Sequence, residues 1–149
     1  MKKLLMSSIV LTTFAIAIAI FQVSSCKKAD AQPTTAKNYP IEGLWIGTYT
    51  VDGEPGLGDQ YFSFVIKPGG TIINDTKGGG VQHLGVGTWA LNGTILTCSF
   101  TCVYGISSNI GITETSTATW DKAGKLTAGI WKNIPPLNGS GTITLTRVN

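Results

Sequence analysis

The chain has 149 residues, of which 13% are charged, and a formal net charge of +3. Lys2 and Lys3 belong to the N-terminal segment, and the rest of the chain carries nine basic against eight acidic side chains. This balance lacks the clustered Lys and Arg of a nucleic-acid-binding surface, and the length suits one domain with one core. We therefore expect a single, nearly neutral domain and no nucleic-acid partner.

The N-terminal segment begins with Lys2 and Lys3, continues through the apolar stretch Leu4–Val23 and ends in two serines before Cys26. A basic start, an apolar core and small residues before a cleavage point are typical of a secretory signal peptide. About 20 apolar residues are also long enough for a transmembrane anchor, which is the alternative.

The segment resembles the signal peptide of bacterial lipoproteins. That resemblance implies cleavage before Cys26, attachment of a diacylglycerol to Cys26 and anchoring of the protein to a membrane of the bacterial cell envelope. An outer-membrane or periplasm-facing location is then favoured over the cytoplasm. We assign residues 1–25 to the signal peptide, 26–40 to a polar lipidated tether and 41–149 to a folded domain.

The folded domain consists of short apolar or alternating runs separated by turn residues. No run in it has a convincing period of 3.6, and the Asn92-Gly93 pair is a strong hairpin signal. Short strands at regular spacing predict an all-β domain, and near-neighbour connections favour an eight-stranded antiparallel up-and-down barrel. A β-sandwich is the alternative. The expected strands are Leu44–Val51, Tyr61–Lys67, Thr71–Asp75, Val81–Ala90, Thr94–Tyr104, Ile112–Trp120, Leu126–Lys132 and Thr142–Val148.

Alternation along these runs separates a buried face from a solvated face. Threonines at every second position of Ile112–Trp120 and Thr142–Val148 predict the outer face. Phe62 and Phe64 share the inner face of their strand, as Leu96, Phe100 and Tyr104 do in theirs. Glu114 falls on the inner side of Ile112–Trp120, where it would be a polar anchor with a raised pKa. A register one residue off would make it a surface charge, and we favour the surface or barrel mouth.

Gly43-Leu44-Trp45 and Arg147 carry a resemblance to the lipocalins and their calycin relatives. The first is similar to the G-x-W signature at the start of the first strand, and the second matches the arginine that packs across that tryptophan. The hairpin 87–97 is similar to a segment of small bacterial lipocalin-like domains. The resemblance covers about 41–148 and implies that Trp45 and Arg147 close the barrel. The Asn/Ser/Trp set needed for biotin binding is missing.

Few residues of the domain suggest chemistry. Cys98 and Cys102 lie four apart in one expected strand, about 13 Å at 3.3 Å per residue, too far for a disulfide unless the strand is broken. His83, the sole histidine, has apolar neighbours and is interpreted as structural. The acidic side chains of the 52–59 loop do not have EF-hand spacing and are interpreted as loop polarity. We expect no metal, no cofactor and no catalytic set.

The functional prediction is a non-catalytic, lipid-anchored protein that binds a small hydrophobic or amphipathic ligand in its barrel. The alternative is a structural or protein- or glycan-interaction lipoprotein with a filled barrel or a sandwich. Tryptophans 89, 120 and 131 lie near strand ends, where they could line a barrel mouth. The expected ligand-contacting residues are the aromatic side chains of Phe62, Phe64, Phe100, Tyr104 and Trp120.

Mass spectrometry of the protein from the membrane fraction tests the anchor. The N-terminal peptide is expected to begin at Cys26 and to carry a diacylglycerol, whereas a Cys26→Ser variant is expected to remain unlipidated. An uncut N-terminus, or an unmodified Cys26 in the wild-type protein, would contradict the lipoprotein assignment.

Overall fold

A computed structural model describes residues 40–148 of the chain, so the predicted signal peptide, Cys26 and nearly all of the tether lie outside the described residues. Within 40–148, the only helical element is a short 3-10 turn, Pro55–Leu57. The strands are β1 (Gly43–Tyr49), β2 (Gln60–Ile66), β3 (Thr71–Gly78), β4 (Val81–Asn92), β5 (Ile95–Tyr104), β6 (Thr113–Trp120), β7 (Lys125–Asn133) and β8 (Ser140–Arg147).

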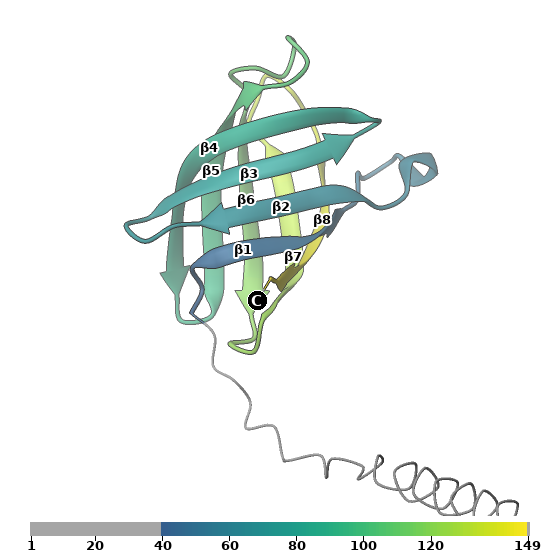
Figure 1. Cartoon of the computed structure of the whole chain (residues 1–149). Coiled ribbons are helices and arrows are strands. Elements are labelled where there is room, and N and C mark those ends of the chain that lie inside the picture. The colour runs from purple at the N-terminus through teal and green to yellow at the C-terminus, as the bar shows by residue number, and fades with distance from the viewer. Residues whose placement is uncertain (1–39, 149) are drawn as a thin grey trace, which may run out of the picture. The chain divides into compact units, whose positions relative to one another are not determined.

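These strands form a closed barrel in which each strand pairs with its neighbours in sequence and β1 pairs with β8 (Figure 1). Every pairing is antiparallel. The predicted all-β, eight-stranded up-and-down barrel is therefore confirmed, and the β-sandwich alternative is wrong. Closure leaves no sheet edge with unpaired backbone groups.

The up-and-down order divides the connections between two ends of the barrel. The loops β1–β2, β3–β4, β5–β6 and β7–β8 lie at one end, which we call the open end. The opposite end, which we call the closed end, holds the remaining three loops, and the described chain enters and leaves there (Figure 1). Odd-numbered strands therefore run toward the open end and even-numbered strands run away from it.

The barrel interior is filled by the alternating faces that the sequence predicted. Phe62 and Phe64 are buried, and Leu96, Cys98 and Phe100 are buried from β5. The threonines of β8 lie on the exposed outer face. The core consists of Ile41, Trp45, Phe62, Phe64, Ile66, Ile72, Leu96, Cys98, Phe100, Ala118, Leu126, Trp131, Ile143 and Leu145.

Trp45 and Arg147 lie together at the closed end. They are directly opposite each other in the β1–β8 register, and Trp45 is fully buried with its Nε1 donating to the Ile41 carbonyl at 2.8 Å. Nη2 of Arg147 donates to the Glu42 carbonyl at 3.0 Å. A Cβ atom on Gly43 would lie 2.9 Å from that Nη2, so the missing side chain leaves space for the guanidinium. Trp45 and Arg147 therefore lie where the first and last strands pair, which is the position expected of residues that help to close the barrel.

Two irregularities change which residues face inward. Leu126 and Trp131 are five positions apart but both are buried, because the β7 register shifts between Leu126 and Gly129, where Ala128 has a φ of 49°. On β5, the pairing with β4 shifts at Leu84/Gly85, opposite the segment from Cys102 to Tyr104. Tyr104 is 57% exposed, so its expected position on the inner face is wrong.

Replacing Arg147 tests closure. Arg147→Ala removes the donor to the Glu42 carbonyl and should lower the melting temperature by roughly 5–10 °C, because such a bond contributes about 1–2 kcal/mol. The melting temperature of Arg147→Lys should lie between those of Arg147→Ala and the wild type, because lysine keeps the positive charge but lacks the planar guanidinium group with its several donors. The matched control is Lys132→Ala, which removes an exposed cation from β7 and should leave melting unchanged. Equal melting of Arg147→Ala and wild type in thermal unfolding would contradict the closing role.

Candidate functional site

A cavity of about 150 Å³ lies inside the open end of the barrel. Its walls come from the last residues of odd-numbered strands and the first residues of even-numbered strands, as the up-and-down order requires. The volume is below the range of about 300–1,000 Å³ usual for drug-sized ligands and close to that of cavities that hold benzene. The lining residues are Tyr49, Phe62, Asn74, Thr76, His83, Leu84, Gly85, Phe100, Cys102, Asn109, Ile112, Glu114, Trp131, Asn133 and Leu137.

A chain of aromatic rings forms one wall of the cavity and continues into the core. The ring centroids are 5.8 Å apart for Trp131–Tyr49, 5.8 Å for Tyr49–Phe62, 4.9 Å for Phe62–Phe64 and 5.8 Å for Phe64–Phe100, all in edge-to-face contact. Trp131 is fixed further because its Nε1 donates to the Thr50 carbonyl at 2.8 Å. Each aromatic pair adds about 0.5–1.5 kcal/mol beyond burial, so this wall is preformed.

Glycine in β4 leaves room beside these rings. Gly85 lines the cavity, and a Cβ atom there would lie 2.9 Å from Cδ2 of Phe100. Any side chain at this position would therefore displace the Phe100 ring or occupy the cavity.

Glu114 is the acidic residue of the cavity lining. It is the second residue of β6 and lies between Phe100 of β5 and Asn133 of β7, its direct partners in the register. Its Oε1 atom is buried and has no hydrogen-bond partner among the described residues. Burial raises the pKa of Glu114 to about 8, so the carboxyl is mostly protonated at neutral pH. Of the position favoured from the sequence, the surface or the barrel mouth, the solvated surface is therefore wrong: Glu114 points inward at the open end of the barrel.

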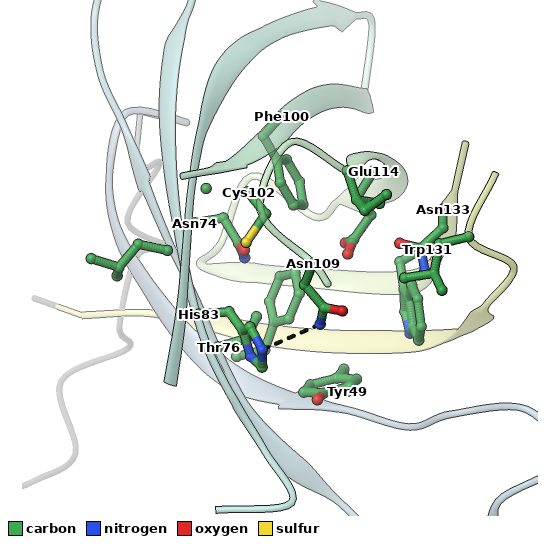
Figure 2. A pocket seen from close by; sticks show the side chains of 15 residues that line it. Tyr49, Asn74, Thr76, His83, Phe100, Cys102, Asn109, Glu114, Trp131 and Asn133 are labelled. Atoms are coloured by element: carbon green, nitrogen blue, oxygen red, sulfur yellow. Dashed lines mark hydrogen bonds between the residues drawn. The ribbon is translucent and has the colours of Figure 1, made fainter. Parts of the chain in front are cut away.

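Amide side chains and the histidine complete the polar lining. Asn109 of the β5–β6 loop forms a hydrogen bond with His83, with 3.3 Å between Nδ2 and Nε2 (Figure 2). The base of this loop is held by backbone bonds in both directions between Cys102 and the segment 111–112, of 2.8 and 2.9 Å. Nδ2 of Asn74 donates to the Ser63 carbonyl at 3.4 Å. These contacts give the polar groups fixed positions around the cavity.

Among the described residues, Cys98 and Cys102 are free thiols, so the strand does not bring them together in a disulfide. Burial raises the pKa of Cys98 to about 12, and the neighbouring Ser116 hydroxyl acts in the opposite direction. Burial also raises the pKa of Cys102, whose Sγ donates to the Tyr104 carbonyl at 3.3 Å. Protonated thiols are poor nucleophiles, so neither side chain is activated for covalent chemistry.

Of the five residues predicted to contact a ligand, only two line the cavity. Phe62 and Phe100 line the cavity, and Phe64 lies beneath it in the core. Tyr104 is exposed and Trp120 packs against the core at the closed end; neither lines the cavity. Trp131 is at the open end, whereas Trp120 ends β6 and Trp89 lies in the last residues of β4, so both lie toward the other end.

Sequence reasoning missed Tyr49, Thr76, Asn109 and Asn133 as cavity residues. Three of them share one signal: Tyr49, Thr76 and Asn133 lie in the last residues of odd-numbered strands. Their position becomes informative only when the direction of each strand is known. Asn109 lies in a loop and has no comparable signal.

The acidic loop between β1 and β2 is held by ordinary polar contacts. Oδ2 of Asp52 accepts a hydrogen bond from Oγ of Ser140 at 2.7 Å. In the part of the chain that the structure describes, no group of three or more His, Cys, Asp or Glu side chains is placed to hold a metal ion.

Comparison with protein-family models, curated proteins and solved structures found no match to this chain. The fold and the cavity therefore define the class: a closed, eight-stranded antiparallel up-and-down β-barrel with a small internal site at one end. A search of residues 40–148 found no helix long and apolar enough to cross a membrane.

The burial of Glu114 predicts a pH-dependent stability. Its pKa is about 8 in the folded protein against an ordinary value of 4.5, so the folded state binds this proton more tightly than the unfolded state. The resulting stabilisation is complete below pH 4.5, decreases as pH rises and is lost above about pH 8. The Glu114→Gln variant lacks this titration.

Thermal unfolding of both proteins between pH 4.5 and 9 is the measurement. The melting temperature of the wild type, taken relative to Glu114→Gln, is expected to decrease over this range. Parallel curves for the two proteins would show that Glu114 titrates with its ordinary pKa.

Proposed function

We propose that this protein is a lipid-anchored, non-catalytic binding protein of the bacterial cell envelope that takes up a small amphipathic molecule in its barrel. The observation that carries the proposal is the cavity at the open end. It combines a wall of aromatic rings with one buried carboxyl oxygen that has no partner among residues 40–148.

The aromatic wall supports an apolar contact. Phe62, Phe100 and Trp131 are buried side chains that also face the cavity, so an apolar group placed against them would leave water. Burial contributes about 25 cal/mol per Å² of apolar surface. A volume of about 150 Å³ limits the buried part of the ligand to roughly one small ring or a short branched chain.

Glu114 supports a polar contact in the same cavity. A buried polar group without a partner costs about 1–3 kcal/mol of stability, which is usually tolerated only where the group has a further use. A ligand that donates a hydrogen bond to Oε1 would recover that loss. An apolar body with a hydrogen-bonding end is therefore the ligand type that fits both walls.

The position of the cavity agrees with anchoring through Cys26. The described chain enters β1 at the closed end, and the cavity lies at the open end. A tether from the membrane would thus join the barrel away from the ligand site. The raised pKa values of Cys98 and Cys102 support binding rather than nucleophilic catalysis.

Exposed apolar side chains near the open end support a second candidate, interaction with another macromolecule. Val103 and Tyr104 of β5 are 54% and 57% exposed, and Ile106 and Ile110 of the following loop are 46% and 51% exposed. Clustered exposed apolar residues are typical of interaction sites. In this case the barrel would present its β5–β6 loop and the cavity would remain unused.

Binding of benzyl alcohol, followed by isothermal titration calorimetry and by tryptophan fluorescence, tests the first candidate. Saturable binding to the wild type is expected. Thr76→Phe, which places a ring into the cavity from β3, should weaken binding at least tenfold. The matched control Thr144→Phe makes the same change on the exposed outer face of β8 and should bind as the wild type does.

Circular dichroism and melting curves establish that both variants are folded. If the folded wild type binds neither benzyl alcohol nor benzylamine, its amine counterpart, or if Thr76→Phe binds benzyl alcohol as well as the wild type does, the cavity is not the ligand site. The second candidate would then be preferred.

A further inference from the structure

We propose that the ligand is a small organic cation, an ammonium group on a compact apolar body, whose charge is paired with the carboxylate of Glu114. This inference rests on the proposed function and adds the chemical class of the ligand. It depends on three features of the cavity: its charge, its aromatic wall and its size.

The charge of the lining is the first feature. Glu114 is the acidic residue among the described lining residues, and that lining includes neither Lys nor Arg. The other lining side chain that can carry a positive charge is His83, which is engaged by Asn109. This carboxyl is mostly protonated in the empty cavity at neutral pH, and its ionised form would require an opposite charge or several donors, because a buried carboxylate without them is strongly unfavourable. The ligand is the available source of that charge.

The aromatic wall is the second feature. Figure 2 shows Glu114, Asn109, Trp131 and Tyr49 around one space. Aromatic rings attract a cation by about 0.5–2 kcal/mol, more when the cation is desolvated, and they repel an anion at their faces. The combination of a carboxylate with Tyr49, Phe62 and Trp131 therefore favours an ammonium group over a neutral hydroxyl or an anionic group.

Donors and acceptors agree with this choice. An ammonium group has up to three N–H donors and no acceptor. Oε1 of Glu114 is an acceptor with no partner among the described residues. Asn109 and Asn133 also line the cavity, and their amide oxygens can accept hydrogen bonds from the remaining N–H groups of the ligand. The limited volume, about 150 Å³, excludes a long chain or a peptide and selects a compact body.

Proton linkage provides a signature that a neutral ligand would not produce. The pKa of Glu114 is raised to about 8 in the empty cavity, so an ammonium ion that binds at neutral pH must displace the carboxyl proton. Affinity should then increase up to tenfold per pH unit below about pH 8 and level off above it, until the ammonium group of the ligand itself loses its proton.

Other titratable groups near this carboxyl come from three other strands. They are Tyr49 on β1, His83 on β4, and Cys98 and Cys102 on β5. Burial is the largest cause that raises the pKa of Tyr49, Cys98 and Cys102, which moves all three away from the neutral range. The lining residues from β2, β3 and β7 have no titratable side chain. If the pH dependence of ligand affinity is lost in Glu114→Gln, then Glu114 and not His83 is the group that releases the proton.

The test compares benzylamine with benzyl alcohol, which share a ring and a methylene and differ in the ammonium group. Calorimetry with the folded protein from pH 6 to 9, in two buffers of different ionisation heat, measures affinity and proton release together. At pH 8.5 benzylamine is expected to bind at least tenfold more tightly than benzyl alcohol, and it should release protons near pH 7. In Glu114→Gln the preference and its pH dependence should disappear.

The outcomes separate this inference from the proposed function. If benzyl alcohol binds to the cavity as tightly as benzylamine at every pH, the ligand is not a cation although the binding function stands. If neither compound binds, both the inference and the proposed function fail. The comparison of the two ligands and the two buffers uses the wild-type protein, so it decides the question even if Glu114→Gln does not fold.

Discussion

The pairing of β1 with β8 closes the sheet, and the location of the candidate site depends on that closure. Trp45 lies opposite Arg147 and Tyr49 opposite Ile143 in this register, so both ends of β1 are fixed against the last strand. A closed sheet has no unpaired edge, and along each strand every second side chain points into the barrel. The two ends of β1 thereby have different surroundings: Trp45 is buried at the closed end, and Tyr49 lines the cavity at the open end.

The two halves of the interior differ because their residues differ in size and polarity. Near the closed end, Trp45, Leu126 and Leu145 are fully or almost fully buried and fill the space. Near the open end, Gly85 contributes no side chain, and polar side chains such as Asn74, Asn133 and Glu114 stand among the apolar ones. An eight-stranded barrel has room either for packed side chains or for one small ligand. Here the same barrel shows packing at one end and a cavity at the other.

Glu114 connects the stability of the barrel with its proposed use. Ionisation of Glu114 lowers the stability of the folded protein, which corresponds to the raised pKa of its carboxyl. An apolar residue in place of Glu114, between Phe100 and Asn133, would remove this loss of stability. The next inward residues of β6, Ser116 and Ala118, are small and buried. Departures from good packing tend to occur at functional sites, and this is the clearest one in the described barrel.

The sequence by itself determined the strands, the turns and the inward or outward face of most residues, because those depend on local alternation and on residues such as Asn92-Gly93. It also indicated the Trp45 and Arg147 pair. Only the tertiary structure decided which end each strand reaches, how the bulges at Ala128 and Leu84/Gly85 redirect Trp131 and Tyr104, and that Glu114 is buried. These depend on pairings between strands, and a change of one residue in register reverses the face without changing the local pattern.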